Sequence, residues 1–522
     1  MNDNCFMNGA ECLLRTLVSN GVDICFMNPG TSEMQFVAAL DRVGGMRPIL
    51  CLFEGVCSGA ADGYARMTGR PAATLLHLGP GLANGLANFH NARKARSPIV
   101  SIVGEHSTQH QSYDAPLSAD IAAFAKSVTS EVRTVATAHE IGADASEAIA
   151  AALRPPGQTA MLIVPADFSW SEAGLPGPVV PRPIQKVPGN DRVHELALRL
   201  QSGAAGLLLG GRTLTRRGLE AAARLAGATG VRVFADRNAA RMESGSGRFQ
   251  PPRIAYFPEQ ATAQLSALQD LILVEAKAPV SFFGYPDQPS FLAPAGCRIH
   301  TLAELDEDGT AALEALAAGC KAAASPLPRQ QHVAAGWAAE SALTPDTAGA
   351  IVGALLPDDA IVSDEMVSAS AAVWPHLAQA APHDYLPVTG GSIGQGLPVA
   401  LGAAIACPGR KVVALEADGS GMYTPQALWS MARENADVTV VIFANNRYRI
   451  LDIEMQRTGA RGFGPVAETM IDIGRPQIDW VALSASLGVQ AVRAGTAGEF
   501  ERAFRSALAL RGPRLIEARI QD

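Results

Sequence analysis

The sequence predicts an α/β protein with three consecutive domains, each built on an open parallel sheet. In the last third of the chain, apolar runs at 412–415 and 438–444 flank a helical pattern, and this alternation is typical of a parallel βαβ unit. Two stretches rich in proline, at 174–189 and 324–346, interrupt the 522 residues, and such stretches mark domain boundaries. The predicted domains are residues 1–173, 190–323 and 345–522.

The first and last domains share a local pattern that predicts duplicated α/β units. In the first, a Gly-Arg pair at Arg70 precedes a strand that ends at His77. In the last, a Gly-Arg pair at Arg410 precedes a strand that ends near Ala417. The middle domain opens with an apolar strand, 205–209, and then Gly-Gly-Arg, which resembles the start of a nucleotide-binding loop without its full fingerprint.

Composition narrows the class of protein. Charged residues make up 18% of the chain and the net charge is −8, which argues against non-specific nucleic-acid binding. The 8 cysteines lack metal-ligand spacing and are expected to be free thiols in a reducing compartment. No apolar run has membrane-spanning length, and the N-terminus lacks a signal-peptide pattern. We therefore expect a cytoplasmic enzyme with neither a nucleic-acid nor a membrane partner.

Polar side chains follow two of the predicted strands in the last domain. Asp418 follows the first strand, and Asn445 follows the second. Between them, Thr424 is the predicted N-cap of a helix and Pro425 its first residue. Because parallel strands end at one edge of a sheet, both side chains should lie where open α/β sheets bind ligands. A carboxylate, an amide oxygen and glycine-rich backbone there suit Mg²⁺ that also holds phosphates.

These residues resemble the signature of thiamine-diphosphate enzymes, Gly-Asp-Gly followed about 25 residues later by Asn-Asn. In this chain Asp418-Gly419 and Asn445-Asn446 occupy the pattern, and Ala417 stands where the family usually has its first glycine. The segment 51–66 is similar to the one that carries the cofactor-activating glutamate of the family, here Glu54. In the family this glutamate binds N1′ of the aminopyrimidine and favours loss of the C2 proton.

The resemblance extends along nearly the whole chain, to the benzoylformate decarboxylase and acetolactate synthase branches. Supporting segments are Asn28-Pro29-Gly30-Thr31, Leu76 to Gly81, Gly390 to Gly396 and Tyr448 to Leu451. The resemblance implies a pyrimidine-binding first domain, a middle domain and a diphosphate-binding last domain. It also implies thiamine diphosphate and Mg²⁺ as cofactors. It implies a homodimer at minimum, with a homotetramer expected, because in relatives Glu54 and the diphosphate site come from different subunits.

The resemblance also implies residue roles. Asp418, Asn445 and the backbone carbonyl of Arg447 would bind Mg²⁺, and a shift of the amide ligand to Asn446 stays open. Gly419 and Ser420 would offer N–H groups to diphosphate. Ile393 matches the bulky residue that bends the cofactor. Other predicted cofactor contacts are Asn28, Glu54, Gly391, Ser392 and Tyr448.

The substrate side is predicted from four residues of the first domain. His77 stands where benzoylformate decarboxylases carry an active-site histidine and acetolactate synthases a small polar residue, and it suits proton transfer. Thr31 matches a position that contacts the substrate carboxylate. His106 and His110 are expected to line the pocket. The second histidine of the benzoylformate branch is replaced by the stretch 283–285, Phe-Gly-Tyr, which disfavours simple benzoylformate decarboxylation.

The expected activity is thiamine-diphosphate- and Mg²⁺-dependent decarboxylation or carboligation of a small 2-oxo acid. One alternative is acetolactate synthesis from two pyruvates, and another is a non-catalytic paralogue that binds the cofactor. The middle domain is expected to be structural; FAD binding there stays open but is not favoured.

Overall fold

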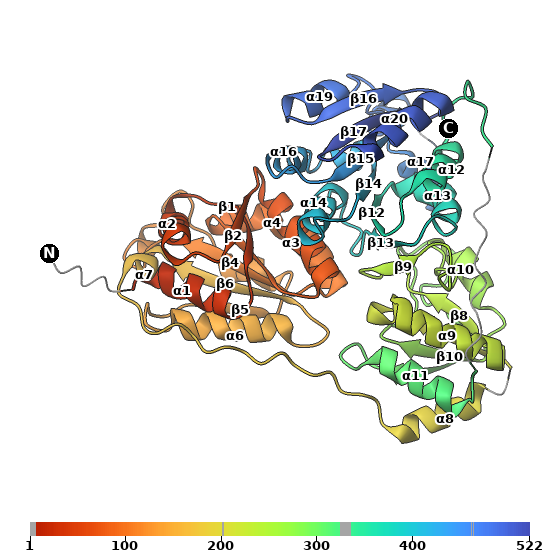
Figure 1. Ribbon diagram of the computed structural model, residues 1–522, viewed down its shortest axis with the longest axis horizontal. Coiled ribbons are helices and arrows are strands. Elements are labelled where there is room, and N and C mark those ends of the chain that lie inside the picture. The colour runs from red at the N-terminus through yellow and green to blue at the C-terminus, as the bar shows by residue number, and fades with distance from the viewer. Residues whose placement is uncertain (1–6, 201–202, 324–335, 461, 463, 522) are drawn as a thin grey trace.

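The computed structural model describes residues 7–200, 203–323, 336–460, 462 and 464–521, so residues 324–335 of the second predicted linker lie outside it. Three separate sheets, each covered by helices, form three bodies along the chain (Figure 1). The predicted α/β class with three consecutive open sheets is confirmed. None of the described helices is both long and apolar enough to cross a bilayer.

The N-terminal sheet has six parallel strands in the order β2-β1-β3-β4-β6-β5. Every residue of β3 is buried, as expected for a central parallel strand with helices on both faces. The elements are α1 (Gly9–Ser19), β1 (Ile24–Asn28), η1 (Thr31–Glu33), α2 (Met34–Val43), β2 (Arg47–Leu50), α3 (Glu54–Thr68), β3 (Ala72–Leu76), α4 (Leu78–Ala95), β4 (Ile99–Glu105), η2 (Gln111–Tyr113), α5 (Ile121–Lys126), β5 (Glu131–Thr134), α6 (Ile141–Leu153), β6 (Thr159–Pro165) and α7 (Ala166–Trp170).

The middle sheet has four parallel strands in the order β11-β10-β7-β8. A short strand of this segment, β9, does not belong to the middle sheet. It pairs antiparallel with β13 at the edge of the C-terminal sheet. The elements are α8 (Asn190–Leu200), β7 (Ala205–Leu209), η3 (Gly211–Leu214), α9 (Arg216–Thr229), β8 (Arg232–Ala235), β9 (Met242–Ser244), α10 (Pro258–Leu265), β10 (Asp270–Val274), β11 (Arg298–Ala303) and α11 (Gly309–Gly319).

The C-terminal sheet has seven strands in the order β16-β17-β15-β14-β12-β13-β9, parallel apart from β9. The predicted strand–helix–strand unit is present as β14, α16 and β15. The elements are α12 (Pro345–Leu355), β12 (Ala360–Glu365), η4 (Val367–Ala369), α13 (Ser370–Leu377), β13 (His383–Pro387), α14 (Gly396–Ala406), β14 (Val412–Ala417), α15 (Asp418–Gly421), α16 (Gln426–Arg433), β15 (Val438–Ala444), α17 (Arg449–Arg457), α18 (Pro465–Glu468), α19 (Trp480–Ser486), β16 (Gln490–Ala494), α20 (Ala497–Ala509) and β17 (Arg514–Arg519).

The start of α16 differs from the prediction. The helix begins at Gln426, and Pro425 is its N-cap. The hydroxyl of Thr424, predicted to cap the helix, donates instead to the carbonyl of Gly394, at 3.0 Å. A tertiary acceptor on the neighbouring loop therefore replaces the local capping bond.

Helices α3 and α14 join the N-terminal and C-terminal bodies and lie side by side in Figure 1. Small residues permit this contact: a Cβ on Gly63 would lie 2.2 Å from the carbonyl oxygen of Val399, and one on Gly402 would lie 1.9 Å from that of Ala60. This close packing fixes the first turn of α14, and with it the loop 390–395 that enters the helix.

Candidate cofactor and active site

Asp418 and Asn445 meet at the carboxyl edge of the C-terminal sheet. Strands β14 and β15 are parallel neighbours, with Ala417 paired to Phe443, so the residues that follow them lie at the same edge. One Asp418 oxygen, Oδ2, accepts the N–H of Asn446 at 2.6 Å, and the other accepts the N–H of Gly419 at 2.9 Å. The parallel strand–helix–strand unit predicted from the sequence therefore brings the two proposed metal ligands together.

The Asp418 carboxylate sits in a setting that favours a bound cation. Burial raises its pKa to about 6, although the backbone N–H groups oppose this shift. Across the described residues, no three His, Cys, Asp or Glu side chains cluster as a metal site. One carboxylate with amide and carbonyl oxygens fits Mg²⁺, which commonly takes its remaining ligands from phosphates and water.

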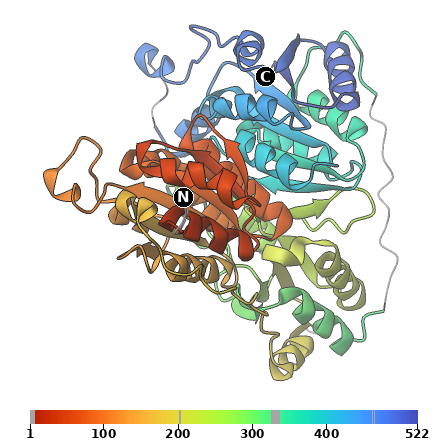
Figure 2. The same ribbon diagram turned by 60° about the vertical axis from the view of Figure 1, so that its left-hand side comes forward.

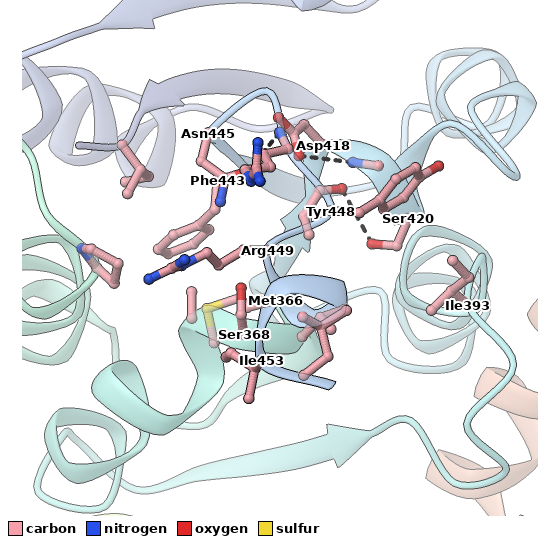
Figure 3. Close-up of a pocket in the computed structure, with 18 residues that line it drawn as sticks. Met366, Ser368, Ile393, Asp418, Ser420, Phe443, Asn445, Tyr448, Arg449 and Ile453 are labelled. Atoms are coloured by element: carbon pink, nitrogen blue, oxygen red, sulfur yellow. Dashed lines mark hydrogen bonds between the residues drawn. The ribbon is translucent and has the colours of Figure 1, made fainter. Parts of the chain in front are cut away.

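A cavity of about 200 Å³ opens beside Asp418 (Figure 3). In Figure 3, Asp418 and Asn445 lie close together, with Ile393 on another side. Seven residues predicted as cofactor or metal contacts line this one cavity: Ile393, Asp418, Gly419, Ser420, Asn445, Arg447 and Tyr448. Gly391 and Ser392 do not line it. Gly391 faces Phe282, and the N–H of Ser392 donates to Asn91 at 3.2 Å.

The positions on either side of Asp418 differ in whether they require glycine. A Cβ on Gly419 would lie 2.4 Å from the Tyr448 ring, so glycine is needed there. Ala417, in contrast, has φ −84° and ψ 150°, an extended conformation that any residue adopts. Alanine in place of the usual glycine therefore leaves the turn unstrained.

Ser420 lines the cavity, but its hydroxyl forms a hydrogen bond with a buried residue behind the cavity wall. The hydroxyl donates to the carboxyl of Glu416, which is fully buried. Any Ser420 contact with a ligand in the cavity is therefore expected through its backbone N–H.

The predicted residues of the first domain follow the carboxyl ends of neighbouring strands. Asn28 ends β1, Glu54 follows β2, His77 follows β3 and His106 follows β4. These strands are adjacent in the sheet, so the four positions share one edge. None of these residues, nor Thr31 or His110, lines the Asp418 cavity.

Glu54 is the first residue of α3 and is 7% exposed. Its Oε2 accepts a hydrogen bond from the side-chain amide of Asn84, at 3.0 Å. Its Oε1 faces Gly81, where a Cβ would lie 3.2 Å away. One carboxylate oxygen is thus held in place, and the other accepts no hydrogen bond from the described residues.

His77 is paired with a carboxylate that the sequence reasoning missed. Its Nδ1 lies 2.8 Å from Oε2 of Glu33, a buried residue, and the same oxygen accepts the N–H of Gly30 at 2.8 Å. Burial raises the pKa of Glu33, and the nearby His77 partly offsets that rise. A Cβ on Gly30 would lie 2.4 Å from the imidazole ring, so the Asn-Pro-Gly-Thr segment is shaped around His77.

The other two substrate-side histidines also come together. The rings of His106 and His110 are 5.2 Å apart, and Tyr113 lies 6.0 Å from His110. They sit on the segment between β4 and α5, which projects from the N-terminal body (Figure 2). Thr31 is exposed at the start of η1. These residues have the polarity to line a pocket.

Comparisons with known proteins cover the whole chain. The chain is 50% identical, over 98% of both proteins, to a Mycobacterium tuberculosis protein whose provisional name is acetolactate synthase large subunit IlvX. It is 31% identical to the benzoylformate decarboxylase of Pseudomonas aeruginosa, over 96% of this chain and 97% of that protein. A solved Rhodococcus jostii structure, a thiamine diphosphate-dependent 4-hydroxybenzoylformate decarboxylase, superposes with a TM-score of 0.86 and 27% identity over 99% of each chain.

Two family domains match the regions that carry the candidate site. Residues 7–124 match the N-terminal TPP binding domain of thiamine pyrophosphate enzymes, and residues 366–518 match the C-terminal TPP binding domain. The first match contains Glu54 and His77, and the second contains Asp418 and Asn445. The chain therefore belongs to the family of thiamine pyrophosphate-dependent enzymes, in the group related to acetolactate synthases and benzoylformate decarboxylases.

Proposed function

We propose that this protein is a Mg²⁺-dependent enzyme that uses thiamine diphosphate to decarboxylate a small 2-oxo acid. The aldehyde-level product would then be released or joined to a second carbonyl compound. The observation that carries the proposal is the Asp418 cavity, where a buried carboxylate, an amide side chain and glycine backbone meet at the edge of a parallel sheet. When bound, the cofactor supplies the electron sink for loss of CO₂.

On the cofactor side, Asp418, Asn445 and the carbonyl of Arg447 would hold Mg²⁺. Gly419 and the backbone of Ser420 would face the diphosphate. The remaining cofactor contacts that we propose are Asn28, Gly391, Ser392, Ile393 and Tyr448. Glu54 would share a proton with the aminopyrimidine, through the carboxylate oxygen that Asn84 leaves open.

We propose that two copies of the chain complete each site. Within one chain, Glu54 does not line the Asp418 cavity, although activation needs the glutamate at the cofactor. A partner's first domain facing this cavity would supply it, so the active unit is a homodimer at minimum, and a homotetramer is the expected assembly. A closed symmetric assembly of this kind is the common form of oligomeric enzymes.

On the substrate side, we propose that His77 transfers protons, with Thr31, His106 and His110 lining the pocket. The contact with Glu33 holds Nδ1 of His77 and leaves Nε2 for the substrate. Glu33 therefore acts as a positioning residue that selects the tautomer of His77.

Replacing His77 with alanine tests this role. We expect proton exchange at C2 of the bound cofactor to stay within about threefold of wild type, while kcat on the substrate falls roughly 10²–10⁴-fold, the usual range for one acid–base group. Glu33→Gln, which keeps the shape but weakens the hold on Nδ1, should give a smaller loss of kcat. If His77→Ala turns over substrate at the wild-type rate, His77 is not the proton-transfer group.

Acetolactate synthesis from two pyruvates is the second candidate, favoured by the provisional name of the 50% identical relative. A panel of 2-oxo acids, with detection of CO₂, aldehyde and acetolactate, separates the candidates. We expect CO₂ release from at least one 2-oxo acid of the panel. Acetolactate from pyruvate alone would select the second candidate, and cofactor binding without any turnover would select a non-catalytic paralogue.

We propose that the middle domain, residues 190–323, is structural. The carboxylate of Glu275 already accepts the N–H groups of Arg212 and Gly309, at 2.8 and 2.9 Å. Within the Gly-Gly-Arg turn, the N–H of Arg212 is thus occupied by an internal carboxylate, and the N–H of Gly210 donates to the carbonyl of Val274. A cavity of about 570 Å³ adjoins this turn, lined in part by Arg96, Arg212 and Glu275, and a nucleotide phosphate on the turn would have to displace Glu275.

The corresponding prediction concerns flavin. We expect the purified protein to show no flavin absorption, and added FAD to leave its melting temperature unchanged, because the Glu275 carboxylate holds the Arg212 amide and would repel a phosphate at the turn. Glu275→Gln, which removes the competing charge, is the variant most prone to gain such binding. Stoichiometric flavin in the wild-type protein would contradict the structural role of this domain.

A further inference from the structure

A pair of buried glutamates lies beneath the loop that carries Ile393. Strands β12 and β14 are parallel neighbours, and Glu365 is paired in register with Glu416. Glu365 is 1% exposed and Glu416 is fully buried. A Cβ on Gly396 would lie 2.4 Å from Oε2 of Glu416 and 3.0 Å from Oε2 of Glu365, so both carboxyl groups converge at the first turn of α14.

The two carboxyls have different hydrogen-bond partners. Glu365 accepts two backbone N–H groups, from Gly394 at 2.8 Å and from Gly396 at 2.6 Å. Glu416 accepts the hydroxyl of Ser420 on Oε1, and its Oε2 accepts no hydrogen bond from the residues that the structure describes. Two adjacent buried carboxyls cannot both be ionised, and the one with two N–H donors is the better carboxylate. Of the two carboxyls, Glu365 is therefore the one that holds the 394–396 turn.

Burial acts against the charge of Glu365, and its hydrogen bonds act in favour of it. Desolvation raises the pKa of Glu365 to about 7, while its backbone donors oppose the rise.

The loop above the pair is fixed on both sides. Gly394 has φ +91°, a conformation that favours glycine. Its N–H is held by Glu365, and its carbonyl accepts hydrogen bonds from Asn88 and Thr424, both at 3.0 Å. Ile393, the preceding residue, lines the Asp418 cavity. The position of Ile393 is therefore set by groups that do not themselves line that cavity.

We propose that Glu365 is a positioning residue of the active site, whose carboxylate fixes the 394–396 turn and thereby the side chain of Ile393. This inference rests on the proposed function, because it takes Ile393 as a cofactor contact. It assigns to the pair no contact with cofactor or substrate.

Two matched variants test the proposal. Glu365→Gln leaves a single acceptor oxygen and turns an NH₂ group toward one of the two N–H donors. Glu416→Gln keeps the acceptor for Ser420 and can donate to Glu365, so it preserves the turn. In cofactor-free protein, we expect amide hydrogen exchange of segment 390–396 to be roughly tenfold faster in Glu365→Gln, and within about threefold of wild type in Glu416→Gln.

The cofactor-bound protein gives the second readout. In Glu365→Gln, exchange of the C2 proton should slow roughly 10–100-fold because Ile393 is displaced, while the dissociation constant for thiamine diphosphate with Mg²⁺ changes less than about threefold. A general loss of structure would instead weaken cofactor binding. In an Ile393→Ala background, Glu365→Gln should add less than about a twofold further loss, because both changes act on one contact.

Three results would overturn the proposal. The first is that Glu365→Gln shows wild-type rates of both amide exchange in segment 390–396 and C2 proton exchange. The others are that Glu416→Gln changes these rates as much as Glu365→Gln does, or that the effects of Glu365→Gln and Ile393→Ala on C2 exchange are fully additive. If Glu365→Gln does not fold, Glu365→Asp carries the same test, because it keeps the charge but withdraws the carboxylate by one methylene. If wild-type protein binds no thiamine diphosphate, the proposed function itself fails, and the amide exchange of the cofactor-free variants still tests the role of Glu365 in the turn.

Discussion

Replacing Asp418 with alanine is expected to abolish binding of thiamine diphosphate and Mg²⁺ together. Among the described residues, Asp418 is the one carboxylate in the lining of the cavity, and it would hold the ion that diphosphate binding requires. Loss of even an outer partner of a metal ligand costs roughly 10–100-fold in affinity, so removal of a ligand should cost more. Calorimetric titration of the cofactor, with and without a chelator, measures the effect.

The control for this change is Asp358→Ala, which replaces an exposed aspartate that does not line the cavity and should bind the cofactor normally. In wild-type protein, chelation should release thiamine diphosphate together with the ion. Unchanged cofactor affinity in Asp418→Ala would show that the metal and diphosphate site lies elsewhere.

Replacing Glu54 with glutamine is expected to leave the fold and cofactor binding near normal and to slow C2 proton exchange. The amide keeps the shape of the side chain and its reach, but it cannot share a proton with the aminopyrimidine. The expected loss is roughly 10²–10⁴-fold, the range of a single acid–base group. Rapid quenching of the bound cofactor in D₂O, followed by NMR, measures the exchange.

His77→Ala is the contrasting variant in the same experiment, because it should exchange normally and fail at a later step. Normal exchange in Glu54→Gln would mean that Glu54 is not the activating acid. The contrast thus separates cofactor activation from handling of the substrate.

The sequence allowed prediction of those features that follow from strand geometry. Asp418 and Asn445 were identifiable because each follows an apolar strand, and parallel strands end at a common edge. The same logic places His77 at the edge of the first sheet, where the structure has it, whereas Glu54 was identified only through the family resemblance. Local pattern was sufficient in these cases because the backbone direction alone determines the position.

The features that escaped prediction are pairings between distant residues. Glu33 is 44 residues from His77 and Asn84 is 30 residues from Glu54, so no periodic pattern links the partners. Glu365 and Glu416 face each other only because β12 and β14 are neighbours in the sheet. Thr424 was predicted to cap a helix, but its hydroxyl donates to the carbonyl of Gly394 in the loop that precedes α14.

An aromatic contact of the middle domain also escaped prediction. The stretch 283–285 was expected to occupy the position of a second active-site histidine. Immediately before this stretch, the ring of Phe282 lies against Gly391, where any Cβ would clash with it. This contact joins residues of two domains, and no local sequence pattern links them.

Mixing two inactive variants tests most directly the central claim that one subunit's Glu54 acts on the cofactor held by its partner's Asp418 cavity. In a hybrid dimer of Glu54→Gln and Asp418→Ala subunits, one site combines both defects and the other combines two intact halves. Random reassortment of equal amounts should therefore restore about one quarter of the wild-type C2 proton exchange, as expected for a two-fold symmetric dimer. If Glu54 and Asp418 served the same site from one chain, every hybrid site would carry one defect, and mixing would restore no exchange.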